Sequence, residues 1–180
     1  MDRNSFEGDF SVERSSPGRC APFERYAVSA CLLGVRCRYD GGTNLREPLL
    51  DLVRQGKAIP VCPEQLGGLP TPRIPAEIEG GDARAVWEGR AAVRNAAGED
   101  VTSSFLRGAE ETLRLARMFG ARAAILKERS PSCGVREVYD GTFQRRLISG
   151  MGVAAYYLAQ NGLEVLSDEE FPAGASSEGG

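Results

Sequence analysis

Short apolar runs separated by polar, glycine-containing stretches indicate a sheet whose strands alternate with helices. Runs of the strand type cover residues 26–30, 58–61, 122–126 and 163–166. Each is rich in Ala, Val, Ile or Leu and is bounded by turn residues or charges, as expected for strands. Because helical patterns lie between several of them, parallel pairing is favoured. We predict a single-domain, layered α/β fold of the Rossmann-like kind, with a mainly parallel sheet.

The stretches between these runs predict helices and one small insertion. Residues 85–87 and 91–94, separated by Glu-Gly-Arg, are typical of a small β-hairpin. Residues 62–75, which follow the second strand-type run, contain four prolines and two glycines, which predicts a stiff, irregular loop. Residues 45–55, 102–119 and 149–160 are predicted helices, and the middle one repeats apolar side chains at Phe105, Ala109, Leu113 and Ala116.

Length and composition fit one globular domain with tails. The chain has 180 residues, of which 42% are hydrophobic, enough to bury a core without disulfides. Residues 1–23 and 171–180 mix Gly, Ser, Pro and charges without apolar periodicity. We therefore predict disordered tails around a domain of residues 24–170. Cys20 falls in the first tail and is interpreted as an incidental thiol.

Charge and residue types exclude several classes of protein. Lys and Arg number 22 against 25 Asp and Glu, so no general basic surface for nucleic acid is expected. No apolar run approaches the ~18 residues of a membrane span. The chain has no histidine, which excludes Ser-His-Asp and Cys-His catalysis and the H-E-x-x-H zinc site. Five cysteines in a chain that shows no signal peptide predict a reducing compartment, so we expect a cytoplasmic protein.

Three cysteines lie just beyond predicted strands. Cys31 and Cys62 directly follow the first and second strand-type runs, and Cys133 lies in the Pro- and Gly-containing turn after the third. In a parallel sheet the carboxyl ends of neighbouring strands lie side by side, and α/β proteins bind their ligands there. We therefore expect the three thiols to converge on one point, although spacing alone leaves equally open that each is a buried core residue.

Three thiolates without histidine favour a soft metal, above all an iron–sulfur cluster. A cubane cluster held by three cysteines has one iron without a protein ligand, and that iron can bind a substrate's sulfur or oxygen as a Lewis acid. A structural zinc ion would need Cys37 or a carboxylate as fourth ligand. Cys37 lies six residues after Cys31, wider than a C-x-x-C redox pair, so we favour a supporting role for this thiol over a redox partnership.

Two further side chains would reach the same point if the cysteines converge. Glu64 lies two residues after Cys62, and it could move protons and direct water. Ser130 lies three residues before Cys133, where it could hold the substrate. The alternatives are a solvated loop acid for Glu64 and a turn hydroxyl bonded to its own backbone for Ser130.

Substrate contacts are also predicted for three further residues, one with a hydroxyl group and two with a positive charge. Ser132 shares the turn of Ser130, and Lys127 opens it. Arg73 follows Glu64 in the proline-rich loop. Individually Arg73 and Lys127 are more typical of surface or ion-pair residues. Positive charge near three thiolates is nevertheless expected, since it would offset an anionic cluster or hold an anionic substrate.

Three motifs, taken together, carry a family resemblance over residues 25–168. They are S-A-C-L-L-G-V-R-C-R-Y-D-G-G from Ser29, V-C-P-E-Q-L-G-G-L-P-T-P-R-I-P-A-E-I from Val61 and K-E-R-S-P-S-C-G from Lys127. The chain resembles the family first catalogued as domain of unknown function 523 (DUF523), to which the thiouracil desulfidases belong. Three separate motifs in the same order make the resemblance specific for the family, and less so for the substrate.

The resemblance implies an α/β enzyme that carries a 4Fe-4S cluster on Cys31, Cys62 and Cys133. By motif, Glu64 is the acid/base and Ser130 positions the pyrimidine. The implied reaction is a non-redox, hydrolase- or lyase-like desulfuration. Thiouracil, or a thiouridine nucleotide, would give uracil and hydrogen sulfide while the iron without a protein ligand binds the substrate sulfur.

Two functions of other classes remain open at this point. A metal- or cluster-binding protein with a structural or sensing role would bind metal without consuming thiouracil. A thiol–disulfide oxidoreductase using Cys31 and Cys37 would stay active after aerobic, iron-free purification. The expected partner is a small thiolated pyrimidine, with no nucleic acid or membrane, and the sequence leaves open whether the protein forms a homodimer.

Overall fold

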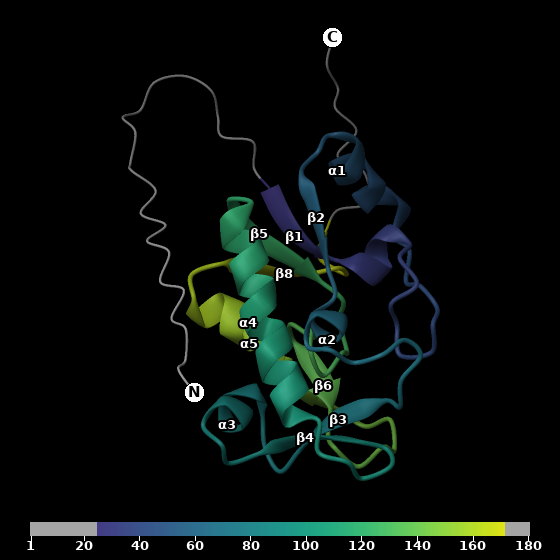
Figure 1. Ribbon diagram of the computed structural model, residues 1–180, viewed down its shortest axis with the longest axis vertical. Coiled ribbons are helices and arrows are strands. Elements are labelled where there is room, and N and C mark those ends of the chain that lie inside the picture. The colour runs from purple at the N-terminus through teal and green to yellow at the C-terminus, as the bar shows by residue number, and fades with distance from the viewer. Residues whose placement is uncertain (1–24, 172–180) are drawn as a thin grey trace, which may run out of the picture.

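The centre of the molecule is a four-stranded parallel sheet (Figure 1). The computed structural model describes residues 25–171, so both predicted tails, apart from Phe171, and Cys20 lie outside the described residues. Each strand pairs in parallel with its neighbour, which confirms the predicted fold class. The strands, in spatial order, are β2 (Ala58–Val61), β1 (Arg25–Ser29), β5 (Ala121–Leu126) and β8 (Glu164–Ser167).

Helices cover both faces of this sheet. On one face α4 and α5 pack their apolar stripes, including Leu113 and Leu158, against buried strand residues such as Ala124. On the other face short helices pack Leu32 and Leu49 against Val28 and Ile125. None of the helices in residues 25–171 is long and apolar enough to cross a membrane. The long helices are α4 (Thr102–Met118) and α5 (Val153–Gln160), and the short ones are η1 (Ala30–Leu33), η2 (Glu47–Leu49) and α1 (Leu50–Arg54).

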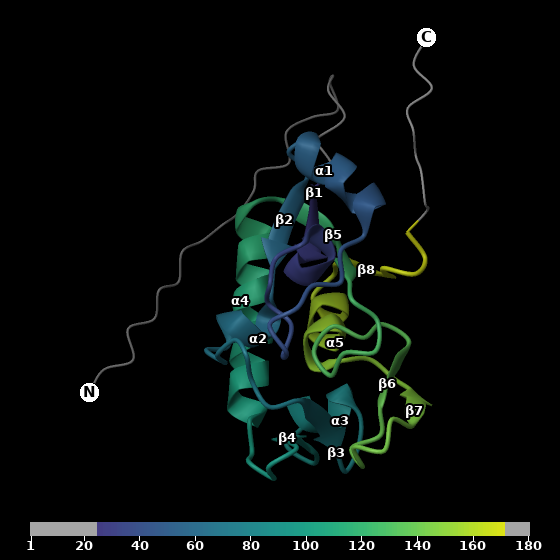
Figure 2. The same ribbon diagram turned by 90° about the vertical axis from the view of Figure 1, so that its right-hand side faces the viewer.

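Two antiparallel strand pairs lie beyond the carboxyl ends of the central strands, as Figures 1 and 2 both show. In one of them β3 pairs with β4, and in the other β6 pairs with β7. The first pair and α3 share a small core with the beginnings of α4 and α5. The bounds of these elements are β3 (Ala76–Glu79), α3 (Ala83–Trp87), β4 (Ala92–Asn95), β6 (Glu137–Tyr139) and β7 (Leu147–Ser149).

The predicted hairpin exists, but its first strand was assigned wrongly. Residues 85–87 belong to helix α3, and the true partner of β4 is β3. The helix forms because the side chain of Asp82 accepts a hydrogen bond from the Ala85 N–H at 2.8 Å and so caps its first turn. Gly89, with a φ of 72°, reverses the chain just after the helix.

The other differences concern proline-containing segments and helix starts. The loop after Cys62, predicted to be irregular, begins with the short helix α2 (Pro63–Leu66). Its proline occupies the first helical position, where the missing N–H is not needed. The predicted 45–55 helix starts only at Glu47, as a 3-10 turn.

Candidate functional site

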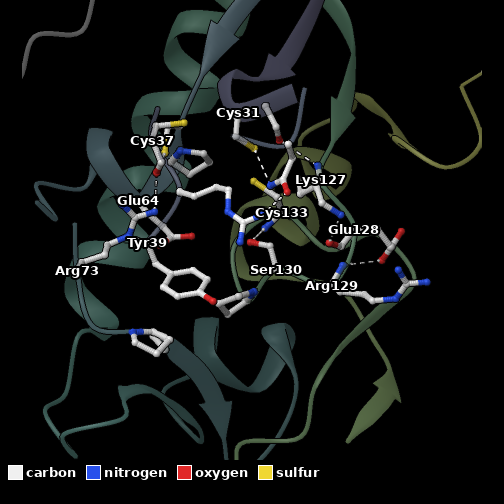
Figure 3. Close-up of a pocket in the computed structure, with 18 of the residues that line it drawn as sticks. Cys31, Cys37, Tyr39, Glu64, Arg73, Lys127, Glu128, Arg129, Ser130 and Cys133 are labelled. Carbon is white, nitrogen blue, oxygen red and sulfur yellow. Dashed lines mark hydrogen bonds and ion pairs between the residues drawn. The ribbon is translucent and has the colours of Figure 1, made fainter. Parts of the chain in front are cut away.

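A cavity of about 550 Å³ opens at the carboxyl ends of β1, β2 and β5 (Figure 3). The loops that follow these three strands form one side of it, and residues of β3, β6 and the β6–β7 loop form the other. The cysteines that line it are Cys31, Cys37, Cys62 and Cys133. The structure thus brings the three predicted cysteines to one cavity, at the edge of the sheet where parallel strands present their ligands.

Cys31 sits in the first turn after β1 and is poised to ionise. A hydrogen bond from the Cys37 thiol lowers the pKa of Cys31 to about 7, against the opposing effect of burial. Asn44 adds to this, since its Nδ2 donates to the Cys31 sulfur at 3.6 Å, and so does the charge of Lys127. Asn44 therefore supports the ionised form of Cys31.

Cys62 and Cys37 form the second part of the thiol group. Cys62 directly precedes α2, and the hydrogen bond with Cys37 lowers the pKa of Cys62 as well. The hydrogen bonds of Cys37 to Cys31 and Cys62 raise its own pKa, so Cys37 stays a neutral thiol between two more acidic ones. This arrangement fits the supporting role predicted for Cys37. All four described cysteines are free thiols.

Cys133 is the most deeply placed of the three. Burial raises the pKa of the Cys133 thiol, the Ser29 hydroxyl opposes the shift, and the neighbouring thiolates of Cys62 and Cys31 add to it. Figure 3 shows the sulfurs of Cys31 and Cys133 turned toward each other. A buried thiolate in this position needs nearby positive charge, which coordination to a metal supplies.

The two serines of the Cys133 turn have different environments. Ser130 lines the cavity, and its Oγ accepts the N–H of Ser132 at 3.2 Å and of Cys133 at 3.1 Å. The hydroxyl hydrogen remains available for a substrate. Ser132 does not line the cavity: it is fully buried, and its carbonyl oxygen accepts the N–H of Ala154 in the first turn of α5. The prediction that Ser132 contacts substrate is therefore corrected, because the turn packs this residue onto α5.

Glu64 and Arg73 act as a pair on the wall of the cavity. Arg73 Nε donates to Glu64 Oε2 at 2.5 Å, and the Arg73 side chain is only 6% exposed. The same guanidinium donates to the Cys37 carbonyl oxygen at 3.0 Å. Arg73, predicted as a substrate contact, thus fixes the position of Glu64 and of the loop that carries Cys37.

Lys127 lines the cavity and carries positive charge close to the thiols. Its Nζ donates to the Glu128 carbonyl oxygen at 3.0 Å and lies 3.7 Å from Asp168 Oδ1. Its side chain is 25% exposed. The structure therefore places Lys127 where the sequence predicted a cation, partly engaged by protein groups and partly facing the cavity.

The opposite wall contains residues that the sequence did not single out. Phe143 and Arg145, in the β6–β7 loop, line the cavity and have positive φ angles of 58° and 60°. The buried Glu77 carboxylate on β3 accepts the N–H of Phe143 at 3.0 Å and ties this loop to the hairpin. Residues other than glycine rarely adopt positive φ angles, and those that do are concentrated at functional sites. The pair Asp140-Gly141 is typical of a turn, but it does not indicate that the following residues line a cavity.

The donor set fits a cluster better than a single ion. Within residues 25–171 no three His, Cys, Asp or Glu side chains are grouped closely enough to hold one metal ion. A structural zinc ion needs four ligands around one atom. In a cubane cluster each cysteine binds a different iron, so the ligand sulfurs are spread around a larger centre. Three thiols from three separate loops around one cavity match that requirement.

Comparison with known proteins gives the chain a family. The profile of the 2-thiouracil desulfurase family matches residues 27–170. The Bacillus subtilis (strain 168) protein YbbK, described as uncharacterized, is 48% identical over 143 residues, which cover 79% of this chain and 95% of YbbK. The solved structure of TudS, a 4Fe-4S-dependent thiouracil desulfidase of the DUF523 group, superposes with a TM-score of 0.74 at 42% identity. That match covers 83% of this chain and 93% of TudS. The chain belongs to the 2-thiouracil desulfurase family, and it is a TudS-like DUF523 protein.

Proposed function

We propose that this protein is an iron–sulfur enzyme that removes the sulfur of a thiolated uracil and releases it as hydrogen sulfide. The observation that carries the proposal is the convergence of Cys31, Cys62 and Cys133, from three strand ends, on a cavity that also holds Glu64 and Ser130. The similarity to TudS supports the same chemistry.

Cys31, Cys62 and Cys133 would hold a 4Fe-4S cluster. When bound, this cluster supplies a Lewis acid for the thiocarbonyl sulfur at the iron that lacks a protein ligand. Cys37 keeps its proton and can donate it to the sulfur of either Cys31 or Cys62, which stabilises the ionised form of that neighbour. Lys127 offsets part of the negative charge that three thiolates bring to the cavity.

Glu64 and Ser130 handle the proton and the substrate. In the net reaction the ring carbon loses sulfur and gains the oxygen of one water molecule, and both protons of that water leave with the sulfide, so no electrons are exchanged. Glu64, held by Arg73, takes a proton from the attacking water and returns it to the leaving sulfur. Ser130, whose oxygen already accepts two backbone N–H groups, uses its hydrogen to fix the pyrimidine.

The far wall of the cavity carries a cation that could bind a charged part of the substrate. Among residues 25–171 Arg145 pairs with no carboxylate, although it lines the cavity, whereas Arg73 and Lys127 have carboxylate neighbours. We infer that a thiouridine nucleotide fits the site better than free thiouracil, with its phosphate near Arg145.

Anaerobic reconstitution of the full-length protein with iron and sulfide tests the proposal. The thiocarbonyl absorbance of added thiouracil or thiouridine monophosphate should disappear with stoichiometric release of sulfide. Activity should vanish in Cys31→Ala, Cys62→Ala and Cys133→Ala. In Glu64→Gln the cluster spectrum should persist while turnover falls.

The other two functions give different results in the same experiment. Cluster binding without any loss of thiocarbonyl absorbance would indicate a structural or sensing protein. Thiol–disulfide exchange that survives iron-free purification in air and is lost in Cys37→Ser would indicate an oxidoreductase that uses Cys31 and Cys37. Either result contradicts the desulfidase proposal.

A further inference from the structure

Glu128 is a buried carboxylate to which the proposed reaction assigns no role. It lies in the turn that follows β5 and carries Ser130 and Cys133, and it is 2% exposed. The nearest guanidinium nitrogen, Nε of Arg136, is 3.8 Å from its Oε2, too far for a hydrogen bond. A buried charge of this kind is costly unless other groups bind it.

Backbone N–H groups of its own loop provide that binding. Oε1 of Glu128 accepts the N–H of Arg129 at 3.3 Å, of Val135 and Arg136 at 3.1 Å each, and of Glu137 at 3.0 Å. One oxygen atom thereby joins both ends of the loop. Hydrogen bonds to an ionised acceptor are roughly twice as strong as neutral ones. The residues enclosed between the two ends include Ser130 and Cys133.

The loop of residues 129–137 is tightly wound and needs to be held in shape. We call the four hydrogen bonds that Glu128 accepts the clamp of this loop. Arg129 has a φ of 58°, which is unfavourable for a residue with a side chain. A Cβ on Gly134 would lie 2.6 Å from the Glu137 carbonyl oxygen and 2.9 Å from that of Ser130, so the chain passes close to itself here. The pairing of Glu128 with the four N–H groups offsets the strain of this path.

A second buried carboxylate connects the clamp to the loop that follows β1. Asp168, just after β8, accepts the Glu128 N–H with Oδ1 at 2.7 Å, and its Oδ2 accepts from Arg46 at 3.1 Å. The Arg46 N–H in turn donates to the Leu32 carbonyl oxygen, next to Cys31. Asp168 thus fastens two of the cysteine-bearing loops to the same strand end.

We propose that Glu128 is a positioning residue whose carboxylate holds Ser130 and Cys133 in their working geometry before cluster or substrate binds. Asp168 fixes this clamp relative to the loop of Cys31. The inference concerns the order of the loop itself, and it rests on the proposed function only where cluster retention is measured.

The test compares Glu128→Gln with Glu169→Gln in the full-length chain. Glu169 pairs with the side chains of Arg129 and Arg136, but it is partly exposed and binds no backbone N–H of the loop, so it is a matched control for the loss of a carboxylate charge next to the loop. Hydrogen exchange is measured first, before any metal is added. In Glu128→Gln the amides of residues 129–137 should exchange at least about tenfold faster than in wild type, because charge-assisted bonds are replaced by neutral ones. The amides of α4 should be unaffected.

Cluster retention is measured next, on protein reconstituted anaerobically. Glu128→Gln should lose iron to a chelator at least about tenfold faster than Glu169→Gln and show an altered cluster spectrum, since one ligand sulfur is less well fixed. Asp168→Asn, a second variant, should also loosen the loop but by less.

Three results would overturn the inference. Unchanged exchange in the loop would show that the carboxylate does not order it. Equal acceleration in the loop and in α4 would reveal a residue that only stabilises the whole fold. A loosened loop with unchanged iron release would separate Glu128 from the placement of Cys133. If no cluster forms even in wild type, the proposed function fails, whereas the exchange measurement still decides whether Glu128 orders the loop.

Discussion

The two sides of the cavity are built in different ways. The side formed by the loops after β1, β2 and β5 continues a parallel sheet whose central strands, β1 and β5, are largely buried, and it is tied together by the buried carboxylates of Glu128 and Asp168. The other side, formed by residues of β3, β6 and the β6–β7 loop, belongs to two-stranded antiparallel pairs. Ile78 on β3 and Val138 on β6 are buried, but the β6–β7 segment is more exposed: Phe143, Leu147 and Ile148 are 36–39% accessible.

We infer from this difference that the first wall, called the sheet side, carries out the reaction, and that the second wall, called the hairpin side, selects the substrate. Thiols that share one inorganic centre must be fixed within fractions of an ångström, which a packed sheet and buried hydrogen bonds achieve. A wall of short strand pairs is less constrained, because each pair depends mainly on contacts that are local in the chain. We therefore expect substitutions on the sheet side to abolish activity, and substitutions on the hairpin side to change which substrate is used.

The largest effect is expected from the cysteines. Cys133→Ala should lose both iron and activity, because a buried ligand sulfur cannot be replaced by water in this apolar position. Cys37→Ala should keep most of the iron, since Cys37 is a neutral thiol that supports its neighbours. Iron and sulfide content after reconstitution measures both. Equal loss of iron in the two variants would contradict the assignment of Cys37.

Glu64→Gln should give the next largest effect. Turnover should fall by about 10²–10⁴-fold, the usual contribution of a general acid–base group, while the cluster spectrum remains that of wild type. Arg73→Gln should give a smaller loss, because Glu64 remains but is no longer held. Steady-state kinetics together with the visible spectrum checks both expectations. A cluster lost in Glu64→Gln would mean that this carboxylate serves the metal centre rather than the proton.

A substitution on the hairpin side should change selectivity alone. Arg145→Gln should raise KM for thiouridine monophosphate by about tenfold, which corresponds to one charge-assisted contact. It should leave KM for free thiouracil, and kcat for both substrates, nearly unchanged. Kinetics with both substrates decides the point. Equal losses with the base and the nucleotide would show that Arg145 does not face the phosphate.

The smallest effect concerns the dependence of stability on pH. Burial alone would raise the pKa of Glu128, but the Ser167 hydroxyl and the backbone N–H groups outweigh it, so the folded pKa lies below the usual 4.5. Ionised Glu128 therefore adds stability above about pH 4.5, and this contribution is lost as the pH falls through the lower, folded value. Arg136, Lys127 and Asp168 are the charged groups around it.

Urea unfolding of the metal-free, full-length protein between about pH 7 and about pH 3 measures this contribution. Glu128→Gln should be less stable than wild type at neutral pH, and the difference should shrink on acidification. A difference that is constant over this range would show that the charge of Glu128 does not contribute to folding.

The sheet side of the site could largely be predicted from the sequence. Short apolar runs followed directly by Cys31 and Cys62, and by the turn of Cys133, are local patterns, and parallel pairing converts them into spatial neighbours. Glu64 and Ser130 could be predicted to reach the same cavity because they are only two and three residues from Cys62 and Cys133 in the sequence. No long-range information was needed beyond the pairing of adjacent strands.

The remainder depends on contacts that the sequence does not announce. Glu128 stands in a run of three charged residues, and only the folded loop shows that its carboxylate binds four N–H groups while Arg129 reaches Glu169 at the surface. Arg73 pairs with the Glu64 carboxylate because the proline-rich loop folds back on α2. Phe143 and Arg145 reach the cavity through positive φ angles that neither residue type favours.

The order of the strands along the chain has a consequence for how such a molecule can diversify. The segment that builds β3, α3 and β4 is inserted between β2 and β5, whose ends sit on either side of β1 in the sheet. Lengthening or exchanging that insert leaves the anchoring points of the sulfurs where they are. The segment from β6 to β7, which carries Arg145, is a second continuous piece, between Cys133 and α5. New specificities can therefore be introduced by exchanging either piece of polypeptide while the reaction centre is unaltered.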